Sequence, residues 1–188
     1  MRKQNMMINN GVIYLVDTLA DYKIQTIVDA ITADNKLGLG KDSIKFEAKP
    51  TITDYDFAGR NDRSMKGMQE INGWEVSIEG DLLDFNQKLM NVTLLEEDTT
   101  DTNADYKKYV PKAKLNDSVD YRNVILVGTV KDSDKPIIIV VKRTFSQDGL
   151  QFELKDAENS AVSLTFKGSY EFDNDEDMPF EILIPTIK

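Results

Sequence analysis

The sequence predicts a mainly β protein: two packed antiparallel sheets, forming a sandwich or barrel, with one flanking α-helix at about residues 84–95. Two observations support this prediction. Short apolar segments recur along most of the chain with polar turns between them, which is typical of antiparallel sheets. One segment near the middle changes from the period of a strand to that of a helix. No linker and no internal repeat is visible, so residues 1–188 are expected to form a single domain.

Composition narrows the classes of function. The chain has no cysteine and no histidine, which excludes disulfides and thiolate metal sites and removes the commonest general base and metal ligand. The net charge is −10, so nucleic-acid binding through a basic face is not expected. No run approaches the roughly 18 apolar residues of a membrane helix. The short run VIYLV, ended by Asp17, does not make a signal peptide.

From these absences we expect no bound metal, no membrane partner and no enzymatic activity. We expect the chain to stay in the cytoplasm where it is made, unless it leaves as part of a larger particle.

The first residues predict an arm followed by a strand. Residues 1–10 are polar and Met-rich without a period, and we expect them to form an N-terminal arm. Residues 12–16 are expected to be a short buried strand. Residues 22–31 have apolar positions at helical spacing, but these positions are mostly Ile and Val, which favour strands. This segment is therefore expected to be a short helix or an irregular turn.

The next region contains an unusually long connection. Residues 37–43 (LGLGKDS) predict a turn, and residues 44–48 then alternate as a strand that Pro50 either ends or places at an edge. Residues 54–70 have no period, although connections in compact domains have a median of about four to six residues. Such long loops are usually functional or become ordered on binding. Three basic residues lie close together in this one: Arg60, Arg63 and Lys66.

The predicted strand and helix at the centre of the chain follow one another closely. Trp74 begins a half-buried strand in which apolar residues alternate with polar ones, including Glu75 and Glu79. We expect Trp74 in the core or at an interface. After Asp84, which is placed to cap a helix, apolar residues recur at helical spacing and define the core face of that helix: Phe85, Leu89 and Val92.

The second half predicts a loop and then five strands. Residues 96–121 are acidic at first and without a period, which indicates a solvated loop. Apolar or alternating segments separated by polar turns then follow in quick succession: residues 123–130, 136–145, 150–154, 162–166 and 180–184.

Motifs for phosphate or metal binding are incomplete. Gly40 and Lys41 resemble the end of a phosphate-binding loop, but Asn35 replaces the first glycine of that motif and Asp42 replaces the hydroxyl residue. Asp173, Asp175 and Asp177 have the spacing of the first ligands in an EF-hand loop. The glycine and the final glutamate of that loop are replaced by Met178 and Ile184. A solvated loop is the main interpretation of this segment, with a weak cation site as the alternative.

A carboxylate pair for glycoside hydrolysis is not defined by the sequence either. Glu79 and Asp81 are one of many pairs among 33 acidic residues, and the two catalytic acids would have to face each other across a substrate. Nothing in the sequence singles out this pair.

Several segments, in order along the chain, are similar to those of one family. They are NGVIYLVDTL, LGLGKDSIKFEAKP, MKG followed by INGWEVSIEGDLLDFN, VILVGTV, KPIIIVVKRTF and PFEILIP. Together they resemble the tail tube protein, also called the major tail protein, of long non-contractile-tailed bacteriophages of Gram-positive hosts. The resemblance covers nearly the whole chain.

This resemblance implies a phage tail-tube-like fold, similar to the tube proteins of contractile tails and secretion machines. It implies a structural virion protein without catalysis or cofactor. Its subunits would form hexameric rings that stack into a hollow tail tube, the conduit for DNA ejection. The implied partners are further copies of the chain, the tape measure, tail tip and tail terminator proteins, and phage DNA that passes without specific binding. The tube would be assembled in the host cytoplasm and reside in the virion tail.

Self-assembly also assigns roles to surface residues. The arm at 1–10 and the loop at 54–70 are expected to connect rings, because neither has much internal reason to be ordered. Within the loop, the expected contacts to a neighbour's acidic loop are Arg60, Arg63, Met65 and Lys66. Glu75 and Glu79 are candidates to face the lumen, where carboxylates would repel DNA phosphates.

Two other classes of function stay open at this point. One is a monomeric β-sandwich binding module for calcium or carbohydrate, which would use the acidic patch at 173–177 and Trp74. The other is a carboxylate-dependent glycoside hydrolase.

Overall fold

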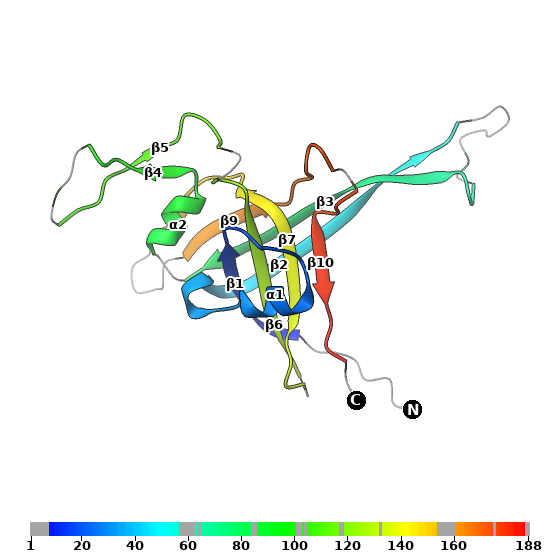
Figure 1. The fold of residues 1–188 in the computed structure, drawn as a ribbon, viewed down its shortest axis with the longest axis horizontal. Coiled ribbons are helices and arrows are strands. Elements are labelled where there is room, and N and C mark those ends of the chain that lie inside the picture. Colours follow the sequence, from blue (N-terminus) through cyan, green and yellow to red (C-terminus); the bar gives the residue numbers. More distant parts are fainter. Residues whose placement is uncertain are drawn as a thin grey trace.

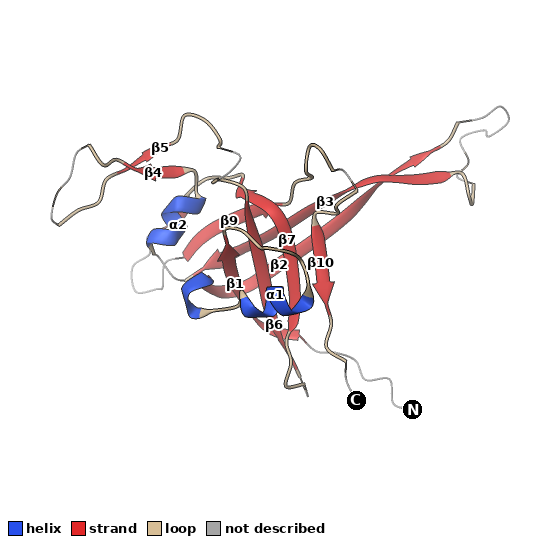
Figure 2. Ribbon diagram, viewed as in Figure 1, coloured by secondary structure: helices blue, strands red, loops and turns tan. Residues whose placement is uncertain are grey.

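The computed structural model describes residues 8–56, 63, 65–83, 86–100, 103, 105–116, 119–131, 133–153, 161–174 and 176–186. In these residues the fold is mainly β, with short helices at its periphery (Figures 1 and 2). The predicted fold class is therefore confirmed.

One large antiparallel sheet forms the body of the protein. Its strand order is β10-β7-β6-β1-β2-β3-β9-β8, and β7 also pairs with β9 through Phe145–Lys167 and Ser146–Phe166. This additional pairing curls the sheet into a barrel-like sandwich. The strands are β1 (Ile8–Val16), β2 (Lys36–Asp54), β3 (Gln69–Leu82), β6 (Arg122–Val130), β7 (Ile137–Ser146), β8 (Gln151–Glu153), β9 (Ala161–Lys167) and β10 (Phe180–Leu183).

The main core lies inside this barrel. Apolar side chains from nearly every strand of the sheet meet there, and Ile78, Leu82 and Phe166 are almost completely buried. A smaller apolar cluster lies on the outer side of β1, β6 and β7. It is covered by the helix α1 (Ile24–Asp29), whose Ile27 is fully buried against residues such as Ile125 and Val140. Of the two alternatives for residues 22–31, the short helix is the correct one.

The predicted central helix is present but shorter than expected. Helix α2 covers only Gln87–Val92, and its cap is Asn86 instead of Asp84. The Asn86 Oδ1 atom accepts a hydrogen bond from the Leu89 amide at 3.0 Å, and its Nδ2 atom donates to the Leu37 carbonyl at 2.9 Å. Leu89 and Val92 are buried, as predicted. Asp84 and Phe85 lie outside the described residues.

The C-terminal end of the helix was predicted wrongly because apolar spacing continues past it. Leu94 has a φ of 60°, which ends the helix, and Leu95 begins the strand β4 (Leu95–Glu97) while still packing against the main core. Strand β4 pairs with β5 (Tyr109–Pro111) in a second, two-stranded sheet. The predicted solvated loop at 96–121 therefore contains a small hairpin, which forms a lobe beside α2 in Figure 1.

Two predictions for the first part of the chain are wrong. The predicted arm at 1–10 is wrong for residues 8–10, which belong to β1, where Ile8 pairs with Val130; residues 1–7 lie outside the described part. Residues 37–43 are not a turn but part of β2, which follows the short 3-10 turn η1 (Ala33–Asn35). The register of β2 against β3 shifts between Gly40 and Ile44.

Gly40 allows this bulge to pack closely. A Cβ atom at Gly40 would lie 2.8 Å from the Ile44 side chain, and a Cβ atom at Gly11 on β1 would lie equally close to it. Gly40, which suggested a turn, is therefore a position where Ile44 packs against the backbone.

The predicted loop at 54–70 is wrong at both ends. Strand β2 continues through Asp54 and β3 begins at Gln69, and the ladder extends one step further because the Tyr55 amide donates to the Met68 carbonyl at 2.8 Å. Pro50 lies inside β2, where β1 no longer pairs with it, so the edge alternative is correct. The five strands predicted for the second half are present as β6 to β10.

Candidate assembly surface

A long two-stranded ribbon extends from the barrel. Figure 1 shows β2 and β3 leaving the body side by side and ending far from the other strands. The two strands pair from Gly40–Leu82 near the barrel to Asp54–Gln69 near the tip. An isolated ribbon exposes both of its faces, so the side chains on each face show what the ribbon can contact.

Inside the barrel, one face of this ribbon is part of the core. Residues that pair across two strands share a face, and the face alternates along each strand. The pairs Phe46–Ile78 and Ala48–Val76 therefore point the same way, and all four side chains pack in or against the main core. Trp74 continues this face. Its ring meets Phe180 of β10 edge-on with 5.4 Å between ring centroids, so Trp74 is half-buried in the core as predicted.

Beyond Trp74 the same apolar face continues into solvent. A one-residue bulge at Asn72 shifts the register, and the next apolar pair is Ile52–Ile71. These two side chains are 53% and 56% exposed. Further large apolar side chains toward the tip are also exposed: Tyr55, Met65 and Met68. The ribbon therefore presents an apolar surface that its own chain leaves uncovered, which is typical of an interaction site.

The opposite face of the ribbon is charged. Lys45 lies opposite Glu79, and Lys49 lies opposite Glu75. The Lys45 ammonium is 2.5 Å from the Glu47 carboxylate and 3.8 Å from that of Glu79, and Lys49 also pairs with Glu47. Hydrogen bonds from Lys45 and Lys49 lower the pKa of Glu47 to about 2. This charged face is therefore stable when it is exposed to solvent.

The predicted lumen-facing residues lie on this charged face. Glu75 is exposed and Glu79 is partly exposed, each beside a lysine of the neighbouring strand. Their negative charge is thus partly compensated within the chain. Whether they line a lumen stays a prediction.

The predicted contact residues lie beyond the ends of β2 and β3. Arg63, Met65 and Lys66 are exposed there, close to the point where Tyr55 meets Met68. Arg60 lies outside the described residues. The structure adds Ile52 and Ile71 to this region. The sequence contains a signal for Ile52, which continues the apolar alternation of its strand, but the bulge at Asn72 takes Ile71 out of the alternation that begins at Trp74.

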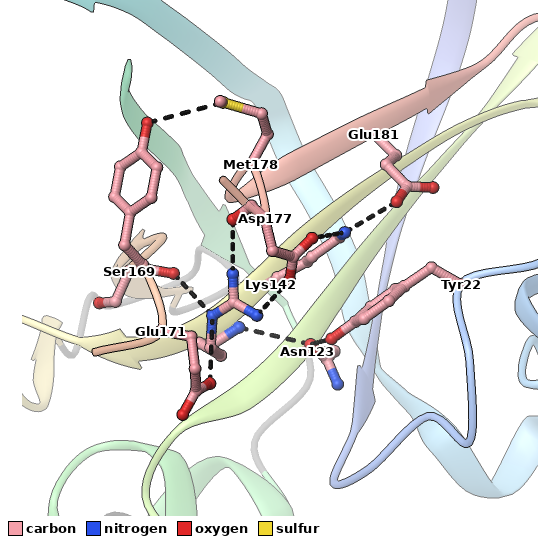
Figure 3. Close-up of polar contacts among 10 residues, drawn as sticks. Tyr22, Asn123, Lys142, Ser169, Glu171, Asp177, Met178 and Glu181 are labelled. Atoms are coloured by element: carbon pink, nitrogen blue, oxygen red, sulfur yellow. Dashed lines mark hydrogen bonds and ion pairs between the residues drawn. The ribbon is translucent and has the colours of Figure 1, made fainter. Parts of the chain in front are cut away.

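A second polar feature, which the sequence analysis missed, joins β7 to the C-terminal segment (Figure 3). Lys142 is only 3% exposed, and its ammonium lies 2.8 Å from both Asp177 and Glu181. The same ammonium lies 3.8 Å from the centre of the Tyr22 ring. The only sequence signal was the pair Lys142–Arg143 in an otherwise apolar strand.

Arg143 completes this cluster from a bulge in β7. Its φ is 50°, in the left-handed region that a non-glycine residue rarely adopts. Its guanidinium donates to the Asp177 carboxylate at 2.7 Å and to the Ser169 carbonyl at 2.9 Å. Burial disfavours the charged form of Asp177, but the hydrogen bonds from Lys142 and Arg143 outweigh burial and lower the pKa of its carboxyl group. The cluster therefore fastens the C-terminal segment to the barrel by charge.

In the part of the chain that the structure describes, the phosphate-loop-like, EF-hand-like and paired-carboxylate motifs do not come together in one site. Gly38 and Lys41 lie within strand β2, and Asp177 is engaged by the two cations of β7. Glu79 and Asp81 lie on one strand, and Asp81 accepts a hydrogen bond from Ser163. Within the described ranges, no group of three or more acidic side chains is placed to hold a metal ion.

Comparison with models of known protein families found no match, and comparison with curated proteins also found none. The fold and the ribbon thus define a mainly β barrel protein with an uncovered apolar extension. None of the helices in the described part of the chain is long and apolar enough to cross a lipid bilayer.

Proposed function

We propose that this chain is the subunit of a phage tail tube, a structural virion protein that assembles with itself into stacked hexameric rings around a hollow channel for DNA. The observation that carries this proposal is the β2–β3 ribbon, whose core-forming face continues outside the barrel as an exposed apolar surface. The hexameric state and the central channel are inferred from the resemblance of the sequence to tail tube proteins.

The ribbon supports contacts along the axis of a tube. Ile52 and Ile71 are only about half exposed, so covering them with a neighbouring subunit would contribute about half the free energy of a full burial, about 1 kcal/mol for each side chain. In the proposed tube, the ribbon of one subunit meets a different surface on the subunit of the next ring, which makes the contact heterologous. A heterologous contact that does not close generates a filament.

The two ends of the large sheet support contacts around a ring. In the described residues, β10 pairs only with β7 and β8 pairs only with β9, so each leaves one open edge. Open edges tend to pair with another chain. In the proposed ring, the β10 edge of one subunit lies beside the β8 edge of the next, and ring closure removes the edges. The net charge of −10 would keep phosphate from binding inside such a ring.

No specific observation favours the calcium- or carbohydrate-binding module. Its acidic patch would need the Asp177 carboxylate, which Lys142 and Arg143 already occupy. Its stacking residue would be Trp74, which packs edge-on against Phe180.

The proposal is tested by electron microscopy of negatively stained protein together with size-exclusion chromatography at rising concentration. Rings or tubes of uniform diameter are the expected result. Tube proteins can stay monomeric until a tail tip starts polymerisation. The concentration series should therefore extend to the highest concentration that the protein allows. A chain that remains monomeric there, and that binds calcium at the 173–177 segment, would contradict the proposal.

A further inference from the structure

A turn between β9 and β10 displays a single aromatic side chain. Phe172 is 99% exposed, the largest exposed fraction among the exposed apolar residues of the described chain. The turn is closed by a bridge between Glu171 and Asn174, with the Asn174 amide donating to the Glu171 carbonyl at 3.3 Å. The Asp177 amide then donates to the Asn174 carbonyl at 3.4 Å.

This turn is fastened to the barrel on both sides of Phe172. Before it, the Tyr170 hydroxyl accepts a hydrogen bond from the Trp74 amide at 2.6 Å, and Arg143 binds the Ser169 carbonyl. After it, Asp177 is held by the β7 cations, as Figure 3 shows. The backbone position of Phe172 is therefore set by the fold. A turn whose backbone is ordered before binding loses less entropy when it binds.

Phe172 contributes no burial to its own chain. Aromatic side chains that fill a pocket on a partner are typical anchors of protein interfaces. The residues around Phe172 are acidic: Glu171, Asp173 and Glu176. An acidic rim repels phosphate groups, so the fitting partner is a protein surface with an apolar hollow and a cationic side chain.

The chain itself contains a hollow on the loop between β5 and β6, in which two apolar side chains lie among polar and charged ones of both signs. Leu115 and Val119 line it and are 45% and 46% exposed. Its other lining residues are Glu96, Lys112, Lys114, Asn116 and Asp120. Lys112 pairs with the buried Asp120, which neutralises that carboxylate. The exposed Lys114 supplies a cation in a chain that is otherwise strongly acidic.

We propose that the Phe172 turn of one copy inserts into the Leu115–Val119 hollow of a second copy, with Asp173 or Glu171 beside Lys114. The turn follows β9 and the hollow follows β5, so they are different surfaces and the contact is heterologous. This inference rests on the proposed self-assembly and assigns it a specific contact between subunits.

Photo-cross-linking tests this contact. Phe172 is replaced by p-benzoylphenylalanine, the protein is irradiated at assembling concentration, and the covalent dimer is mapped by mass spectrometry. We expect cross-links to residues 112–119 of another copy. The matched control places the same photoreactive residue at Tyr106, which is 78% exposed on another loop and should give no such link.

A charge exchange provides the second measurement. Phe172→Ala should weaken self-association about 10- to 100-fold, the loss expected for one well-buried aromatic side chain. Lys114→Glu should also weaken it, and Lys114→Glu combined with Asp173→Lys should restore part of the loss. Circular dichroism checks that each variant is folded.

The outcomes separate the two proposals. Rings that form normally while residue 172 cross-links elsewhere, or while Phe172→Ala assembles as well as the wild type, would overturn the Phe172 contact and leave the tail tube function standing. Absence of a covalent dimer under conditions where rings form would likewise overturn the Phe172 contact alone. A chain that forms neither rings nor dimers at the highest attainable concentration, and that binds calcium at the 173–177 segment, would overturn both.

Discussion

Ile52 and Ile71 face each other across the β2–β3 ribbon, one bulge beyond the Pro50–Trp74 pair, and more than half of each isoleucine side chain is exposed. Trp74 belongs to the same face and reaches the core, where it contacts Phe180. The apolar surface that folds the barrel therefore continues outside it. This relationship is the physical basis for proposing that a second copy covers the ribbon.

Replacing both isoleucines tests whether this surface drives assembly. Ile52→Thr with Ile71→Thr keeps β-branched residues in the strands but removes apolar surface. We expect the monomer to unfold at nearly the same temperature, because both side chains are exposed in it. The concentration needed for ring or tube formation should rise at least tenfold, as measured by light scattering.

The matched control alters the other face of the same ribbon. Lys49→Gln with Glu75→Gln changes a neighbouring cross-strand pair without changing apolar surface or net charge. Assembly of this variant should resemble that of the wild type. Equal assembly by the isoleucine variant would show that the apolar pair is not an interface.

Charge reversal in the loop at the tip tests the predicted ionic contacts. Arg60→Glu with Arg63→Glu should weaken tube formation and leave the monomer folded, because a neighbour's acidic loop would then be repelled. The effect should diminish at high salt. As a control, Lys131→Glu with Lys135→Glu makes the same change in charge in the turn between β6 and β7. If both variants form tubes equally well, the loop makes no such contact.

Lys142 is predicted to be important for stability. Lys142→Met removes a buried cation and leaves Asp177 and Glu181 without it, so the free energy of unfolding should fall by about 3 kcal/mol, near the low end for breaking a buried ion pair, since both carboxylates keep some contact with water. Denaturant titration measures the loss. The control Lys167→Met, at an exposed position of β9, should change stability by about 0.5 kcal/mol or less.

Acid should weaken the same cluster. The pKa of Asp177 is lower in the folded chain than its ordinary value of 3.8, so its carboxylate stabilises the fold above that value. This contribution is lost as the pH falls through the lowered pKa of the folded state. Asp177→Asn should cost about 2 kcal/mol near neutral pH, the scale of hydrogen bonds to a charged group.

The diagnostic result is the slope against pH. The stability of Asp177→Asn should fall less steeply than that of the wild type below about pH 4. Some acid sensitivity should remain, because Asp21, Glu47 and Asp98 also have a lowered pKa. Parallel curves for the two proteins would mean that Asp177 does not contribute through its charge.

The cap of α2 can be tested separately. Asn86→Ala removes the bond to the Leu89 amide and the bond to the Leu37 carbonyl, so we expect a loss of about 1–2 kcal/mol. Asn86→Asp keeps the capping oxygen and should recover part of that loss. Thermal unfolding of the wild type and the two variants measures these differences. Equal unfolding temperatures for all three proteins would show that Asn86 does not stabilise the helix as a cap.

The sequence predicted strands well where one face of the strand is buried and the other is exposed to solvent. In β3, Val76 and Ile78 are buried while Glu75 is exposed, and the alternation is visible in the residues. The prediction failed where a strand has no buried face and therefore needs no alternation of apolar and polar residues. The ribbon beyond Trp74 is surrounded by solvent on both faces, so residues such as Thr53 and Glu70 pair as strands without an apolar pattern.

Other features depend on contacts between distant segments. Gly40 suggested a turn, but it lies in a strand where Ile44 packs against it. Lys142 meets Asp177 and Glu181 only after β7 and the C-terminal segment have come together. The sequence shows an acidic loop and a basic pair 35 residues apart, and nothing in their spacing reveals that they bind each other.

The measurement that tests the central claim most directly is an electron cryomicroscopy reconstruction of the assembled wild-type protein. The expected result is a hollow tube of stacked rings in which the β2–β3 ribbon of each subunit lies on the adjacent ring with Ile52 and Ile71 buried. A particle in which the ribbon projects freely into solvent, or one without a continuous central channel, would contradict the account.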